Sequence, residues 1–129
     1  MSEFGRQSGS HPRVPMLLSL AMIVRDGGQN LTSLLAEAHS WVDEIVIGDT
    51  GSRDASVAVA QEHTAQVHHI EWTDNFAAAR NQVLDRCRGA WILILDADEL
   101  LSKSTWRDLR AWVVQQENER HYQAGSIVT

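Results

Sequence analysis

Three carboxylates follow one another closely at the end of an apolar run. The run Ala90–Leu95 contains aromatic and β-branched residues and leads directly into Asp96, Asp98 and Glu99. A short apolar run of this kind is typical of a strand buried on both faces, as in parallel sheets covered by helices. Carboxylates one residue apart repel each other unless a cation or hydrogen-bond donors compensate. The pattern favours a hard divalent cation that holds a phosphate-bearing ligand, although acids here would also suit the N-terminus of a following helix.

The composition is that of one globular domain without a nucleic-acid partner. The chain has 129 residues, of which 43% are hydrophobic, enough for a compact core. Its net charge is −6, from 11 basic and 17 acidic residues, which makes a nucleic-acid backbone an unsuitable partner. Cys87 is the one cysteine, so an internal disulfide is excluded and a reducing, cytoplasmic location is expected. No apolar run approaches the ~20 residues of a membrane span.

The elements that position these carboxylates alternate between strand and helix. A polar leader over residues 1–15 is expected to be disordered, and apolar runs then predict strands over residues 17–24, 44–48, 67–72 and 91–95. Apolar spacing and capping residues predict helices from Asn30 to Ala38, from Ser52 or Asp54 to His63, from Phe76 to about Arg88, and from Ser102 or Ser104 onward. The tail is predicted to turn extended at Ile127 and Val128. Such an unfinished sheet edge favours self-association.

This alternation indicates an α/β fold. It predicts a parallel, helix-covered sheet of right-handed βαβ units, of the Rossmann-like kind. When the strands lie in the order third, second, first, fourth, the chain reverses between the first and the fourth, and a ligand crevice opens there. Asp26, Asp49, Asp96 and Asp98 each follow a strand, so this order brings all four to one edge of the sheet.

Other features are ambiguous on their own. The loop Gly48–Asp54 combines glycine with a helix N-terminus and suits phosphate, but it lacks the lysine of a Walker A loop. Asp49, taken alone, is more typical of a turn-forming residue than of a ligand contact. Arg80 lies among alanines, where it either contacts a phosphate or is a solvated surface residue. The histidines lack zinc-site spacing, and the tryptophans are assigned to packing, with Trp72 near the predicted crevice.

Four blocks of sequence, taken together, resemble the nucleotide-sugar half of a family-2 glycosyltransferase. The blocks are Ser19–Asp26, Val42–Asp54, Trp72–Asn81 and Leu95–Glu99. The resemblance implies a GT-A fold, apparently truncated, with residues 16–129 as the nucleotide-sugar-binding half. It also implies a UDP-sugar or similar donor as the partner of the site, together with an acceptor that the sequence does not identify.

The resemblance further implies roles for single residues. Asp49 would contact the nucleobase, Arg80 would lie near the base or the diphosphate, and Asp96 would hold the ribose. Asp98 would coordinate Mn²⁺ or Mg²⁺ bridging the diphosphate. The first strand of the family commonly ends in Lys-Asn-Glu-Glu, with the first glutamate near the nucleotide. Here the strand ends in Arg25-Asp26-Gly27-Gly28, and Asp26 is taken as the nucleotide-sugar-binding residue of this segment.

The function implied by the resemblance is inverting, metal-dependent sugar transfer. In this family the other half supplies the carboxylate base, so we expect that base outside this chain and predict donor binding with little or no transfer. A non-catalytic nucleotide- or partner-binding remnant of the same fold is the alternative. A haloacid dehalogenase-like phosphatase also has a strand ending in Asp-x-Asp, but it requires Thr or Val soon after, where this chain has Glu99 and Leu100.

Overall fold

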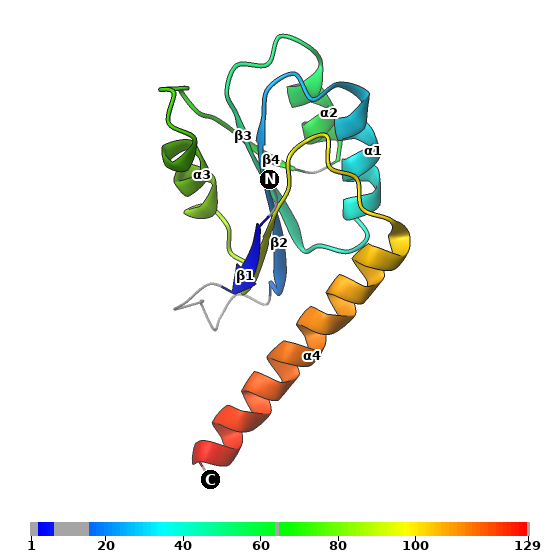
Figure 1. Ribbon diagram of the computed structural model, residues 1–129, viewed down its shortest axis with the longest axis vertical. Helices are drawn as coiled ribbons and strands as arrows, with labels where there is room; N and C mark the ends of the chain where they lie inside the picture. The colour runs from blue at the N-terminus through cyan, green and yellow to red at the C-terminus, as the bar shows by residue number, and fades with distance from the viewer. Residues whose placement is uncertain (1–2, 7–15, 64, 129) are drawn as a thin grey trace.

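A single sheet carries helices on both of its faces (Figure 1). The computed structural model describes residues 3–6, 16–63 and 65–128. The strands are β1 (Glu3–Arg6), β2 (Leu18–Val24), β3 (Glu44–Asp49), β4 (Gln66–His69) and β5 (Trp91–Ile94). The helices are α1 (Gly28–Ala38), α2 (Ser56–Glu62), α3 (Phe76–Leu84) and α4 (Lys103–Val128). No helix in the described part of the chain is long and apolar enough to cross a membrane.

The strand order β1-β5-β2-β3-β4 confirms the predicted α/β sheet. β2 pairs in parallel with β3 and with β5, and β3 pairs in parallel with β4. The four predicted strands therefore lie in the predicted order, third, second, first, fourth. The chain reverses between β2 and β5, so the loops that follow these two strands open on the same edge of the sheet.

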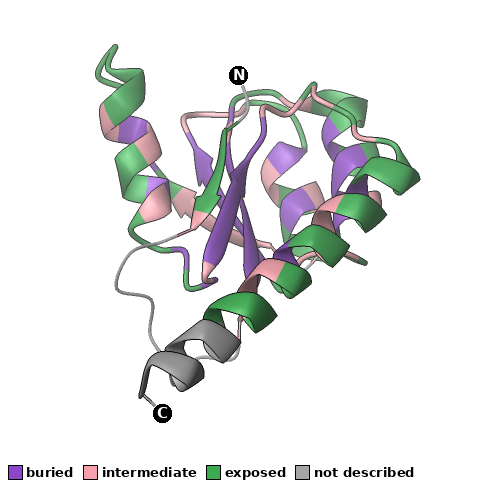
Figure 2. Cartoon of the chain, turned by 60° about the horizontal axis from the view of Figure 1, so that its bottom comes forward, coloured by how far each residue is buried: buried purple, intermediate pink, exposed green. Residues whose placement is uncertain are grey.

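The sheet separates two apolar cores, because successive residues of a strand face opposite sides. Alternate residues of β2 from Leu18 to Val24 pack toward α1, α2 and α4. Ala21 belongs to the opposite face, where Ala79 and Val83 of α3 cover the sheet. Figure 2 shows the central strands buried between these layers, while the edge strand β1 and the outer faces of the helices are exposed.

The prediction of a disordered leader is wrong for Glu3–Arg6, which form β1 antiparallel to β5. Phe4 stacks on Trp91 with ring centroids 5.2 Å apart, and Arg6 donates to Glu117 of α4 at 2.5 Å. The leader therefore contributes an edge strand through contacts that lie far away in sequence. Residues 1–2 and 7–15 lie outside the described part of the chain.

The predicted extended tail is also wrong, because α4 continues through Ile127 and Val128. Helix propagation adds one backbone hydrogen bond per residue, whereas an isolated extended pair has no partner strand. The unfinished sheet edge, on which the prediction of self-association rested, is therefore not formed by these residues. The first part of α4 packs on the body through Trp106 and Val113, and its C-terminal end extends away from the sheet (Figure 1).

β4 and α3 are shorter than predicted. β4 ends at His69, although the apolar run predicts a strand as far as residue 72. Trp72 consequently lies in a turn before α3. Asn75 begins that helix by accepting a hydrogen bond from the Ala78 N–H at 3.1 Å. Asp74, inside the turn, has a left-handed backbone with φ 57°.

Candidate functional site

An open cleft of about 410 Å³ lies at the carboxyl edge of the sheet. It is formed by the loops after β2 and β5. Its lining comprises Ile23, Arg25, Asp26, Gly27, Asn30, Asp96, Ala97 and Asp98. The structure thus brings together Asp26, Asp96 and Asp98 from separate parts of the sequence, as predicted, whereas Asp49 and Arg80 are outside this lining.

The loop after β5 is a tight turn that presents Asp98 to solvent. The N–H of Glu99 donates to the carbonyl of Asp96 at 3.0 Å, and the N–H of Asp96 donates to Glu99 Oε1 at 3.0 Å. Glu99 is therefore engaged in shaping the loop, while Asp98 is exposed at the cleft. Asp96 and Asp98 thus lie one residue apart at the carboxyl edge of the sheet, as the sequence indicates.

Asp26 joins the loop after β2 to the loop after β3. It adopts a left-handed backbone with φ 54°. Its Oδ1 accepts hydrogen bonds from the N–H groups of Arg53 at 2.7 Å and Asp54 at 3.2 Å, and its own N–H donates to Ser52 Oγ at 2.9 Å. These bonds engage one oxygen of Asp26 in holding two loops together. The sequence pattern does not reveal this arrangement.

Asp54, in the loop after β3, also hydrogen-bonds to the segment after β2. It accepts from the Gly28 N–H at 3.2 Å and from the Ser56 N–H at 2.9 Å. The hydrogen bonds from the hydroxyl and the N–H of Ser56 are the largest influences on the pKa of Asp54 and hold it below its usual value. Ser56 Oγ also accepts from the Gly27 N–H at 2.8 Å. Hydrogen bonds of Asp26, Asp54 and Ser56 thus join the loops after β2 and β3 along the cleft, and we call this network the clamp.

Gly27 packs this clamp against the Asp96–Glu99 turn. A Cβ added at Gly27 would lie 3.0 Å from Leu31 Cβ and 3.3 Å from Ala97 Cβ, tighter than ordinary contacts. A side chain at this position would therefore require the neighbouring Leu31 or Ala97 to shift by a few tenths of an ångström. This close approach of Gly27 to Ala97 sets the distance between the two walls of the cleft.

Asp49 is buried at the end of β3 and forms the predicted turn. Its Oδ2 accepts from the N–H groups of Gly51 at 3.2 Å and Ser52 at 3.1 Å. Its Oδ1 is buried without a hydrogen-bond partner among the described residues. A buried carboxylate oxygen without a donor is costly, so Asp49 retains unused hydrogen-bonding capacity at the end of β3.

Arg80 lies on α3 and pairs with Glu3 of β1. This contact between β1 and α3 takes up one end of the guanidinium, while Arg80 Nε is buried without a partner among the described residues. The structure therefore places Arg80 beside the edge strand, and its proximity to a diphosphate stays a prediction.

A second, more apolar pocket adjoins the cleft, and the sequence reasoning missed it. This pocket of about 300 Å³ is lined by Ile23, Arg25, Thr50, Trp72 and Phe76. Trp72 and Phe76 are each 39% exposed, so the prediction that the tryptophans serve packing does not hold for Trp72. Their positions on either side of the Asn75 helix cap, with Trp72 before it and Phe76 directly after it, are the sequence signal that could have suggested a surface role.

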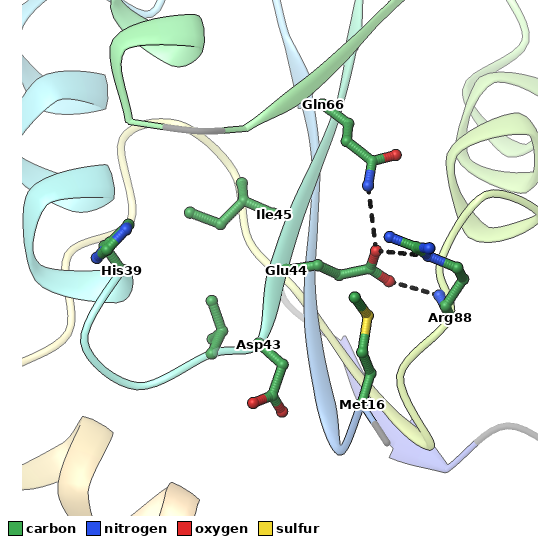
Figure 3. A pocket seen from close by; sticks show the side chains of 8 residues that line it. Met16, His39, Asp43, Glu44, Ile45, Gln66 and Arg88 are labelled. Carbon is green, nitrogen blue, oxygen red and sulfur yellow. Dashed lines mark hydrogen bonds and ion pairs between the residues drawn. The ribbon is translucent and has the colours of Figure 1, made fainter. Parts of the chain in front are cut away.

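A larger cavity, of about 430 Å³, opens at the opposite, amino edge of the sheet (Figure 3). The carboxylate of Glu44 in this cavity has a structural role. Glu44 accepts hydrogen bonds from Ser19 Oγ at 2.6 Å and from the Arg88 N–H at 2.5 Å. Gln66 and the Arg88 guanidinium lie at 3.4 Å from its other oxygen. Since these bonds tie β2, β3, β4 and the loop before β5 together, this network accounts for the acidic lining.

The comparison with known families agrees with the motifs at the carboxyl edge. The model of glycosyl transferase family 2 matches residues 19–119, most of the chain. The chain belongs to glycosyl transferase family 2. This membership confirms the predicted resemblance and leaves the phosphatase alternative without support.

Relatives of this family-2 domain are longer proteins. A TPR repeat-containing protein of Synechococcus elongatus is 47% identical over 100 residues, which cover 78% of this chain and 25% of the relative. The glycosyltransferase SunS of the SPbeta prophage of Bacillus subtilis is 25% identical over 88 residues, which cover 67% and 21%. The chain thus spans about a quarter of the length of these relatives.

Solved glycosyltransferases share the fold. Mannosyl-3-phosphoglycerate synthase from Rubrobacter xylanophilus matches with a TM-score of 0.60 and 22% identity, over 68% of this chain and 33% of that one. Glucosyl-3-phosphoglycerate synthase from Mycobacterium tuberculosis, solved with Mn²⁺, UDP and glucosyl-3-phosphoglycerate, matches with a TM-score of 0.56 and 17% identity, over 64% and 34%. These likenesses confirm the predicted GT-A fold.

Proposed function

We propose that the cleft at the carboxyl edge binds the nucleotide-diphosphate part of a sugar donor, with UDP as the favoured nucleotide. The observation that carries this proposal is the exposed Asp98 beside Asp96, in an open cleft at the chain reversal. Membership of glycosyl transferase family 2 supports sugar transfer as the reaction that the donor serves. The related synthase solved with Mn²⁺ and UDP supports the same class of ligand.

The donor set of the cleft suits Mn²⁺ or Mg²⁺. Both are hard cations that prefer oxygen ligands, and Mg²⁺ is commonly bound by one or two carboxylates together with substrate phosphates. Within the described residues, no group of three or more His, Cys, Asp or Glu is placed to hold a metal ion. A cation whose coordination is completed by the diphosphate fits this arrangement. When bound, it would neutralise the charge of the leaving diphosphate.

Each residue of the site has a separate task in this proposal. Asp98 holds the cation, and Asp96 accepts a hydrogen bond from the ribose. Asp49 offers its unpartnered Oδ1 to an N–H of the base. Arg80 serves the base or the diphosphate once Glu3 no longer occupies it. Asp26 acts through the clamp that it holds, because its Oδ1 is engaged with backbone N–H groups.

Sugar transfer with inversion needs a base that takes a proton from the acceptor hydroxyl. We assign this base to no residue of the chain and propose that residues 16–129 form the donor half of a site that other residues complete. The chain's small share of its relatives' length supports a division of this kind.

The single, buried thiol of Cys87 is consistent with the reducing, cytoplasmic compartment that we propose.

The test is calorimetric titration of the chain with UDP, with and without Mn²⁺. We expect binding that depends on Mn²⁺, and Asp98→Ala to weaken it by about 100-fold or more, because residues that merely support metal ligands already contribute about 10- to 100-fold. Asp108→Ala removes an exposed carboxylate of α4 and serves as the matched control. Binding without Mn²⁺ dependence, or equal binding by Asp98→Ala, would contradict the metal role. No binding by the folded chain would favour the non-catalytic remnant.

A further inference from the structure

The aromatic pocket beside the cleft is the feature that the residue roles above leave unused. Its two large side chains, Trp72 and Phe76, are each 39% exposed, so their rings are accessible to a ligand. They line a concave pocket of about 300 Å³ with Ile23 and Thr50. Small-molecule sites are typically concave, mostly apolar and edged by a few polar groups.

The pocket and the acidic cleft form one continuous binding region. Ile23 and Arg25 belong to the linings of both. A ligand that spans them needs a flat, apolar ring at one end and an anionic, cation-binding group at the other. Arg25, at the junction, adds a positive charge suited to an anionic linker. A nucleoside diphosphate with its metal has this distribution of groups.

The turn before α3 holds the Trp72 indole in place. The indole Nε1–H donates to Asp74 Oδ1 at 2.9 Å, and Asp74 has a left-handed backbone with φ 57°. Two residues further on, Phe76 begins α3 behind the Asn75 cap. Because the turn is fixed at the indole and at the cap, the aromatic ring stays at the pocket without being buried. A ring held in this way loses little conformational entropy when a ligand stacks on it.

We infer that Trp72 and Phe76 form the platform on which the base of the nucleoside diphosphate stacks, with Asp74 as the residue that positions the indole. This inference rests on the proposed function and adds the recognition of the base to it. Aromatic rings bind the π-face of any base, so the platform supplies affinity, while Asp49 reads an N–H of the ring. From the sequence, contact with the base is predicted for Asp49, and Arg80 is predicted near the base or the diphosphate; neither aromatic residue is included.

The experiment compares two probes on the same variants by calorimetry in the presence of Mn²⁺: UDP, which carries the base, and inorganic pyrophosphate, which does not. Trp72→Ala is expected to weaken UDP binding by about 5- to 150-fold and to leave pyrophosphate binding unchanged. Trp72→Phe, which keeps an aromatic face, is expected to lose less. Trp112→Ala is the matched control, since Trp112 is a comparably exposed tryptophan on α4.

The positioning role of Asp74 is tested with the same probes. Asp74→Asn keeps an acceptor oxygen and tolerates a left-handed backbone, so it retains UDP affinity, whereas Asp74→Ala loses part of it. Unchanged UDP affinity in Trp72→Ala, or an equal loss for both probes, overturns the platform. If that result accompanies Mn²⁺-dependent binding that Asp98→Ala abolishes, the proposed function stands and the platform alone fails. A folded chain that binds neither probe overturns both.

Discussion

At the scale of single residues, Asp26 lines the cleft and yet has its carboxylate directed to the protein backbone. Its Oδ1 accepts from the N–H groups of Arg53 and Asp54, and its φ is 54°. A carboxylate used in this way stabilises the walls of a site, and its charge is not required for the contact. Asn variants should therefore distinguish the two residues, because Asp26→Asn is expected to keep UDP binding and a variant of Asp98 is not.

Replacing Asp26 by Asn and by Ala separates the two roles. Asp26→Asn retains the acceptor oxygen and tolerates the left-handed backbone, so we expect unchanged stability and unchanged Mn²⁺-dependent UDP affinity. Asp26→Ala loses the hydrogen bonds and keeps an unfavourable φ, and we expect about 1 kcal/mol less stability in urea unfolding. If Asp26→Asn loses UDP affinity as Asp98→Ala does, Asp26 is a direct ligand after all.

The residue types at the site are predictable from sequence, while several of their partners are not. Asp96 and Asp98 follow a strand and lie at its end, because the apolar run before them determines that position. The clamp of Asp26 depends on a loop 27 residues further on, which no local pattern specifies. Trp72 resembles a core residue in sequence, and its exposure follows from β4 ending at His69.

At the scale of elements, the strands and helices with strong apolar periodicity are those that the sequence predicts. α1 buries the expected Leu31, Leu34, Leu35 and Ala38. β1 could not be predicted, because Phe4 is its only large apolar residue and its pairing with β5 is a tertiary contact. The helical conformation at the end of α4 could not be predicted either, since the β-branched residues there favour a strand but have no partner strand.

α4 is docked to the body through two carboxylates. Asp43 accepts from Arg110 of α4 at 2.9 Å. Burial raises the pKa of Asp43, but the hydrogen bonds from Arg110 and from the N–H groups of Leu17 and Leu18 together outweigh it and lower the pKa. The hydrogen bond from Arg6 lowers the pKa of Glu117 of α4, and the Trp91 indole, at 2.8 Å, adds to this effect.

We therefore expect the docking of α4 to weaken in acid. Both folded pKa values are depressed, so this stabilisation is complete above the unfolded values of about 4 and is lost as the pH falls below them. Urea unfolding between pH 6 and pH 3, followed by tryptophan fluorescence, measures the loss. The Asp43→Asn, Glu117→Gln double variant should show a flatter pH dependence, and Asp108→Asn is the control. A double variant with the wild-type slope would show that other groups govern acid stability.

At the scale of the whole molecule, the acids of the two sheet edges differ in how they are used. At the amino edge, Glu44 is 8% exposed and surrounded by donors from three directions. At the carboxyl edge, Asp98 is exposed and stands one residue from a second carboxylate. The first arrangement contributes to the stability of the fold. For the second, we expect like-charge repulsion to leave no net contribution to the stability of the ligand-free chain.

Neutral analogues at the two edges should therefore have opposite effects. Glu44→Gln turns a donor toward groups that themselves donate, and we expect a loss of about 2 kcal/mol in the free energy of unfolding. Asp98→Asn removes repulsion and should leave the stability of the ligand-free chain unchanged or higher. With UDP and Mn²⁺ at 100 times the dissociation constant, the wild type and Glu44→Gln should each gain about 2.7 kcal/mol, whereas Asp98→Asn should gain little. A destabilised Asp98→Asn, or a Glu44→Gln variant as stable as the wild type, would contradict this division, because structural carboxylates would then lie at the cleft and dispensable ones at the amino edge.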